Sequence, residues 1–123
     1  MLKKDDDMTN YARGVKAENL AVDYLKKHGY EILKTRYKTK FGEIDIIAKH
    51  EDCLCFIEVK MRGSERDALE SVTPRIQKRI ENSALFFLSE NAVYNDFGMR
   101  FDVIAVTPPF HIRHLDNAWQ TRS

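Results

Sequence analysis

The sequence predicts an α/β domain in which a mixed β-sheet is flanked by helices. Two long stretches place apolar residues at the spacing of an amphipathic helix, and the shorter stretches around them are rich in β-branched and aromatic residues. The chain has 123 residues, of which 43% are hydrophobic, which is enough for the core of one domain. We therefore expect a single domain over residues 1–123, with the element order α-β-β-β-α-β and room for one more strand.

The first helix is predicted over residues 11–28. Its apolar positions recur every three or four residues, at Ala17, Leu20, Ala21, Tyr24 and Leu25. Thr9 or Asn10 can cap its start, and Gly29 suits the position after its end. Residues 1–9, which are mostly polar and charged, are expected to form a flexible N-terminus.

Three strands are predicted next, over residues 30–36, 42–49 and 54–61. The second and third, GEIDIIAK and LCFIEVKM, are rich in β-branched or aromatic residues. The polar residues 50–53 separate them, so the two strands are expected to form a β-hairpin.

The second helix is predicted over residues 74–89. Thr73 followed by Pro74 is a favourable start, since threonine caps a helix and proline fits its first turn. Apolar residues then recur at helical spacing, at Ile76, Ile80, Ala84, Phe87 and Leu88.

The end of the chain predicts one long strand and a second, shorter one. Residues 99–106 are an apolar run that two consecutive prolines terminate. Residues 110–115 can add a short edge strand, and residues 116–123 are expected to be a polar C-terminal tail.

The register of the hairpin follows if residues 50–53 form its loop, because Lys49 then pairs with Leu54. In that register Asp45 lies opposite Glu58 on one face of the sheet. The other face becomes wholly apolar, with Ile44, Ile46 and Ala48 opposite Val59, Ile57 and Cys55. A slip of two residues would keep the faces and change the partners.

Two carboxylates at opposite positions of a ladder repel each other unless a cation neutralises them. Mg²⁺ or Mn²⁺ suits Asp45 and Glu58, because these ions prefer oxygen ligands. Lys60, two residues after Glu58, points to the same side and can stabilise charge on a phosphate. The pattern therefore favours phosphodiester hydrolysis, whereas the alternative interpretation is an ion-pair patch on a solvated sheet face.

Two helical residues can complete such a site. Glu18 borders the apolar face of the first helix and can supply a third metal-binding carboxylate. Gln77 has the same relation to the second helix and can orient water or contact a phosphate. Both placements depend on how the helices pack, and the alternative is that each is an exposed helical residue.

The formal net charge of +1 does not indicate a nucleic-acid-binding protein, so a binding surface has to be local. An extended chain places Lys34, Arg36, Lys38 and Lys40 on one face. A second basic group consists of Lys60, Arg62, Arg66, Arg75, Lys78 and Arg79. Together they can follow a phosphate backbone, or the lysines can simply protect an edge strand from aggregation.

The only two cysteines, Cys53 and Cys55, are too close along one strand to join distant parts of the chain. With His50 they do not form a zinc-binding set of familiar spacing. The chain also has no apolar run of membrane-spanning length, and its N-terminus does not look like a secretory signal. We expect reduced thiols and a soluble, cytoplasmic protein that makes no membrane contact.

The combination of motifs resembles the YraN family, and through it the PD-(D/E)XK nucleases of restriction-endonuclease-like fold. The resemblance rests on two strands, GEIDIIA (residues 42–48) and FIEVKMR (residues 56–62), in which Asp45 precedes Glu58 by thirteen residues. It extends to Gly14, Glu18, Gly29, Tyr30, Ser71, Val72, Thr73, Gln77, Ala84 and the segment RFDV (residues 100–103).

The resemblance implies a restriction-endonuclease-like core with Asp45, Glu58 and Lys60 as the catalytic triplet, and with Glu18 and Gln77 as helical accessories. It also implies likeness to Holliday-junction resolvases. The chain departs from the pattern in the second helix, where Ile76 replaces a common lysine, and in residues 63–70, which lack the usual phenylalanine-glycine.

We therefore expect a nucleic-acid-binding protein, with DNA as the preferred partner, that acts as an endonuclease dependent on Mg²⁺ or Mn²⁺. The substrates expected from the resemblance include branched DNA, whose cutting on two strands would require a homodimer. The alternative is a non-catalytic module that binds nucleic acid or a protein on the same fold.

Overall fold

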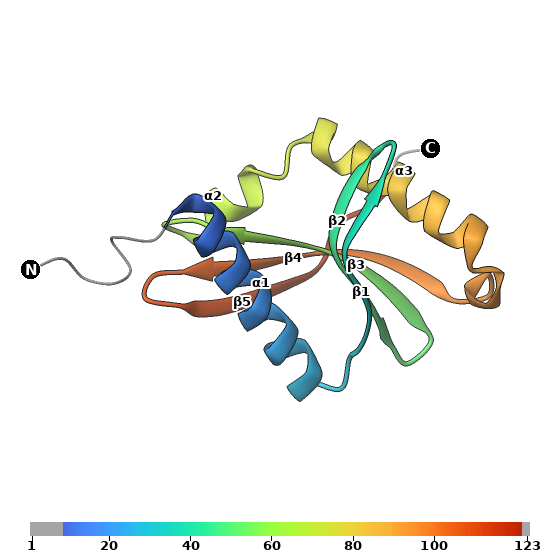
Figure 1. Cartoon of the computed structure of the whole chain (residues 1–123), viewed down its shortest axis with the longest axis horizontal. Coiled ribbons are helices and arrows are strands. Elements are labelled where there is room, and N and C mark those ends of the chain that lie inside the picture. The colour runs from blue at the N-terminus through green and yellow to red at the C-terminus, as the bar shows by residue number, and fades with distance from the viewer. Residues whose placement is uncertain (1–8, 122–123) are drawn as a thin grey trace, which may run out of the picture.

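The computed structural model describes residues 9–121, and Figure 1 shows how its elements are arranged. The predicted flexible N-terminus, apart from Thr9, lies outside the described residues. In chain order the elements are α1 (Asn10–Lys27), β1 (Glu31–Thr39), β2 (Gly42–His50), β3 (Cys53–Met61), α2 (Glu65–Glu70), α3 (Pro74–Glu90), the 3₁₀ helix η1 (Ala92–Tyr94), β4 (Gly98–Thr107) and β5 (His111–Trp119). This order confirms an α/β chain and adds the short helix α2.

One mixed sheet contains the five strands in the order β1-β2-β3-β4-β5. The strands β1, β2 and β3 are antiparallel neighbours, β4 is parallel to β3, and β5 is antiparallel to β4. A parallel pair needs a long connection, which α2, α3 and η1 provide here. The expected mixed sheet flanked by helices is thus confirmed.

The two long helices cover opposite faces of this sheet. Neighbouring residues of β2 point to different sides, so that Ile46 and Ala48 pack beneath α1 whereas Ile47 packs beneath α3. Ala17, Ala21 and Leu25 are the buried residues of α1, and Ile80, Ala84 and Phe87 are the buried apolar residues of α3. The sheet therefore separates two apolar clusters.

Local sequence signals account for the ends of these helices. The Thr9 hydroxyl accepts a hydrogen bond from the backbone N–H of Ala12 at 3.0 Å, and the Thr73 hydroxyl accepts one from Ile76 at 3.3 Å. After α1, Gly29 adopts a φ of 87°, which glycine tolerates without strain. The predicted caps and the glycine stop are confirmed.

The predicted hairpin register is confirmed over the ladder from Lys49–Leu54 to Ile46–Ile57. The loop is shorter than the four residues expected, because His50 also pairs with Cys53 and leaves a two-residue turn. Glu51 makes this turn possible by adopting a φ of 54°.

The expected position of Ile44 is wrong. Ile44 packs with Ile47 in the cluster beneath α3, instead of sharing a face with Ile46 and Ala48. The alternation breaks at Asp45, whose carboxylate, rather than a backbone group, bonds to β3. On the other side of β2, Arg36 has a left-handed φ of 49°.

The C-terminal segment is longer than predicted. Strand β5 continues through residues 116–119, which were expected to belong to a polar tail. Trp119 accounts for the difference: its ring stacks on Phe101 with centroids 5.2 Å apart, and its Nε1 donates to Glu81 at 3.0 Å. The aromatic anchor thus holds a polar-looking strand at the edge of the sheet.

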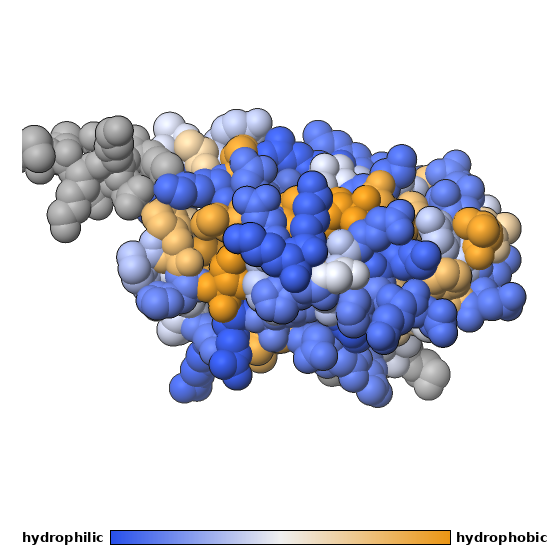
Figure 2. Space-filling view, turned by 90° about the horizontal axis from the view of Figure 1, so that it is seen from below, coloured by the Kyte–Doolittle hydropathy of each residue, from blue (hydrophilic) through white to orange (hydrophobic). Residues whose placement is uncertain are grey.

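The surface in Figure 2 is mostly hydrophilic, and its apolar residues form separate patches. Large exposed apolar side chains lie on different elements, such as Tyr11 on α1, Leu85 on α3 and Val93 on η1. Within residues 9–121, no helix combines the length and the apolar content needed to cross a membrane.

Candidate functional site

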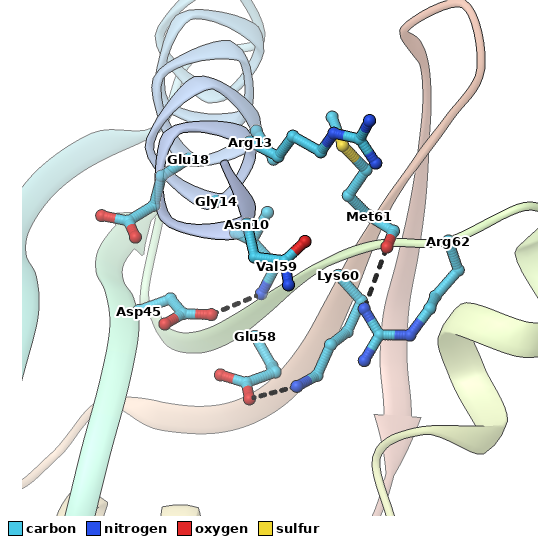
Figure 3. Close-up of a pocket in the computed structure, with 11 residues that line it drawn as sticks. Asn10, Arg13, Gly14, Glu18, Asp45, Glu58, Val59, Lys60, Met61 and Arg62 are labelled. Atoms are coloured by element: carbon cyan, nitrogen blue, oxygen red, sulfur yellow. Dashed lines mark hydrogen bonds and ion pairs between the residues drawn. The ribbon is translucent and has the colours of Figure 1, made fainter. Parts of the chain in front are cut away.

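An open pocket of about 370 Å³ lies between the first half of α1, the first half of β2 and the end of β3. Its walls include Asn10, Arg13, Gly14 and Glu18 from α1, Asp45 from β2, and Glu58, Lys60 and Arg62 from the end of β3 and just beyond it. Figure 3 shows these side chains around a common space. The structure therefore brings together four of the five predicted catalytic residues.

Asp45 is held where β2 and β3 stop pairing. The ladder ends at Ile46–Ile57, and the Asp45 Oδ2 atom then accepts a hydrogen bond of 2.8 Å from the backbone N–H of Val59. The carboxylate thus takes a position that a backbone carbonyl occupies in a regular ladder. The same bond fixes its direction toward the pocket (Figure 3).

Glu58 is the most deeply buried polar residue of the pocket, with 8% of its surface exposed. Its Oε2 atom lies 3.4 Å from Lys60 Nζ, whereas Oε1 is buried and has no hydrogen-bond partner among the described residues. Burial and the nearby Asp45 carboxylate raise the pKa of Glu58 to about 8, although Lys60 opposes this shift. Without a cation, Glu58 is therefore largely protonated at neutral pH.

Glu18 lies in the same pocket but is bonded to a different partner. Its Oε1 atom accepts a hydrogen bond of 3.0 Å from Arg36 Nε, and its side chain is 16% exposed. Burial raises the pKa of Glu18, the Arg36 hydrogen bond opposes that effect, and Asp45 adds to it. Glu18 therefore reaches the pocket from the border of the apolar face of α1, where the sequence placed it, and stays partly exposed.

The donor set suits a hard divalent cation held by two carboxylates. The unpartnered Glu58 Oε1 atom is an oxygen that a cation would satisfy, and Asp45 keeps one oxygen outside the bond to Val59. Across residues 9–121, the structure holds no group of three or more His, Cys, Asp or Glu side chains placed to bind one ion. Glu18 is therefore not gathered with the other two carboxylates into a ligand set.

Gln77 is the predicted catalytic residue that the structure does not bring to this pocket. It lines a separate small hollow with Pro74, Lys78, Glu81 and Gln120, on α3 and next to β5. Its Nε2 atom donates to the carbonyl of Val72 at 3.0 Å, which ties the start of α3 to the preceding turn. Ile76, which replaces a lysine of the family pattern, packs against the cluster beneath α3.

The predicted basic residues fall into separate groups. Lys34, Arg36, Lys38 and Lys40 are all exposed, but the left-handed Arg36 interrupts the extended geometry, and Lys40 lies in the turn after β1. Arg75, Lys78 and Arg79 are exposed on α3, across the sheet from α1. Arg66 pairs with Glu70 at 3.0 Å within α2. Of the two predicted groups, only Lys60 and Arg62 line the pocket.

Three pocket residues were not singled out by chemistry in the sequence, namely Asn10, Arg13 and Gly14. The helical repeat holds a signal for Gly14, because the residue four positions before Glu18 lies on nearly the same side of α1. The helix was predicted correctly, so this repeat was sufficient to place Gly14 beside Glu18, whereas Arg13 and Asn10 lie further around the helix.

The fold and the pocket together define an α/β protein in which two carboxylates and a lysine meet where neighbouring strands diverge. Residues 17–106 match the uncharacterised protein family UPF0102, which is the YraN family, and the chain belongs to it. A UPF0102 protein of Mesorhizobium japonicum is 42% identical over 113 residues, covering 92% of this chain and 90% of the relative. A UPF0102 protein of Rhodopseudomonas palustris is 42% identical over 109 residues, covering 89% of this chain and 84% of the relative.

A comparison of folds gives a much weaker likeness. The solved structure of Pyrococcus furiosus SfsA in complex with Ca²⁺ aligns with a TM-score of 0.28 and 11% identity. The alignment covers 85% of this chain and 62% of that one.

Proposed function

We propose that this UPF0102 protein binds nucleic acid, with DNA as the preferred substrate, and hydrolyses its phosphodiester bonds as an Mg²⁺- or Mn²⁺-dependent endonuclease. The observation that carries the proposal is the buried, unpartnered oxygen of Glu58, which lies between the Asp45 carboxylate and Lys60 in an open pocket. A surface ion-pair patch would not bury a carboxylate at this cost.

The order of the elements supports a finer proposal for the fold. Three antiparallel strands follow α1, and a helical crossover leads to a strand parallel to β3. The carboxylates and the lysine lie on the second and third strands, as the resemblance to PD-(D/E)XK nucleases implies. We assign the chain a restriction-endonuclease-like core on these grounds.

In this proposal Asp45 and Glu58 hold the cation, which supplies charge neutralisation at the phosphate and makes attacking water more acidic. Lys60 Nζ lies 3.4 Å from Glu58 Oε2. Its positive charge would stabilise the negative charge that develops on the phosphate in the transition state. Glu18 is not one of the proposed metal ligands. It can accept a proton or bind outer-shell water once Arg36 releases it. Gln77 has no part in the proposal, because its amide is bonded to Val72 in another hollow.

The test is cleavage of labelled linear, single-stranded and four-way-junction DNA in Mg²⁺ or Mn²⁺, with EDTA as the control for metal. We expect cleavage that EDTA abolishes and that is lost in Asp45→Asn and in Lys60→Ala. Glu43→Gln is the matched control, since it changes an exposed carboxylate of β2 outside the pocket. If every substrate stays intact while salt-sensitive binding persists, the nuclease proposal is wrong and the non-catalytic binding module is the better account.

A further inference from the structure

Gly14 occupies an unusual position for a glycine, in the interior of α1 and on the wall of the pocket. Glycine is the least favourable residue in a helix interior except proline, because it loses the most backbone freedom there. Among residues 9–121, a Cβ atom added at Gly14 would meet nothing within 4 Å. Packing against these residues therefore does not require a glycine here, and they leave the space above it open.

The pocket that Gly14 lines also contains Glu58. Glu58, which is 8% exposed, lines this pocket, and its buried Oε1 atom has no hydrogen-bond partner among the described residues. Figure 3 shows Gly14 on α1 above Asp45 and Glu58, which lie on the two strands. A ligand bound in this pocket therefore lies against the first half of α1.

Cationic side chains stand on two walls of the same space. Arg13 extends from α1, the residue next to Gly14, and Arg62 extends from the end of β3 on the same side of the pocket (Figure 3). Lys60 lies between these arginines and the carboxylates. A ligand with several consecutive negative charges would match this arrangement, because one phosphate can face Lys60 while its neighbours face the arginines.

We propose that Gly14 is a clearance position for substrate, over which the sugar-phosphate backbone of a nucleic-acid strand passes into the pocket. The proposal rests on the proposed function and adds a path for the strand, between α1 and the end of β3, with Arg13 and Arg62 on the phosphates next to the reacting one. Gly14 is thus a positioning residue whose contribution is the absence of a side chain. It explains why a residue that weakens a helix stands where the protein itself leaves room for alanine.

Gly14→Ala separates this account from a structural one, because it is expected to stabilise the protein and weaken binding of substrate. We expect an equal or higher melting temperature, since alanine favours the helix and its Cβ meets none of the described residues within 4 Å. Affinity for a fluorescent single-stranded oligonucleotide, measured without metal, should fall roughly five- to a hundredfold if a methyl group overpacks the strand. Gly63→Ala is the matched control, because its added Cβ also meets nothing within 4 Å in the part of the chain that the structure describes, and Gly63 does not line the pocket.

The outcomes distinguish this proposal from the proposed function. Weaker binding by Gly14→Ala with unchanged binding by Gly63→Ala supports the strand path, whether or not the wild-type protein cuts DNA. Equal binding by Gly14→Ala and the wild type overturns the path even if both cleave DNA. A wild-type protein that binds no oligonucleotide overturns both proposals.

Discussion

Replacing Glu58 by glutamine should stabilise the metal-free protein at alkaline pH. The pKa of Glu58 is about 8 in the folded chain against an ordinary value of 4.5, so the folded state holds an extra proton between these two pH values. The unfolding free energy therefore falls as pH rises from 4.5 to about 8. Integrated over this window, the loss amounts to as much as about 5 kcal/mol.

Glutamine keeps the shape of the side chain and removes its titration. Allowing for the weakened contact with Lys60, we expect Glu58→Gln to raise the unfolding free energy by about 2–5 kcal/mol at pH 8.5 and by much less at pH 5. Urea unfolding in EDTA at both pH values measures this difference, with Glu43→Gln on the exposed part of β2 as the control. Equal stabilities of Glu58→Gln and the wild type at pH 8.5 would refute the reasoning.

Three further predictions concern the metal, the binding surface and the core. Mn²⁺ binding, followed by calorimetry, should tighten by about tenfold per pH unit below pH 8, because Glu58 has to release its proton; pH-independent binding would place the ion elsewhere. Arg62→Ala should weaken DNA binding and lower its salt dependence by about one phosphate contact, whereas Arg75→Ala, on the other side of the sheet, should change neither; the reverse order would move the binding surface to α3. Asp102→Asn should lower the free energy of unfolding by about 3–5 kcal/mol, because it removes a buried charge that accepts hydrogen bonds of 2.7–2.9 Å from Arg100 and His114. Thermal unfolding measures this loss, and a loss below about 1 kcal/mol would contradict the account.

The sequence predicted the elements that depend on local chemistry. Thr9, Gly29 and Thr73 mark helix ends through bonds and backbone angles that involve only nearby residues. The β2–β3 register was predictable up to a slip of two residues, because a slip of one would turn Ile46 and Ile57 away from the core, whereas a slip of two keeps both on the same face.

Features that depend on distant contacts were not predictable in the same way. The break at Asp45 requires the backbone of Val59, and the extension of β5 requires the stacking of Trp119 on Phe101. Gln77 and Glu18 have similar positions on their helices, yet only Glu18 reaches the pocket, because α1 and α3 cover opposite faces of the sheet. Helical periodicity identifies a face of each helix but not the side of the sheet on which the helix packs.

The central claim is that the carboxylate pair and Lys60 form a site for metal-dependent phosphodiester cleavage. The most direct measurement is the rate at which the wild-type protein and Asp45→Asn, purified in parallel, cut one labelled DNA substrate in Mn²⁺ at pH 8. The account predicts cleavage by the wild type that falls at least about a hundredfold in Asp45→Asn while DNA binding persists. Equal rates for the two proteins, or no cleavage of DNA that the wild type binds, would contradict it.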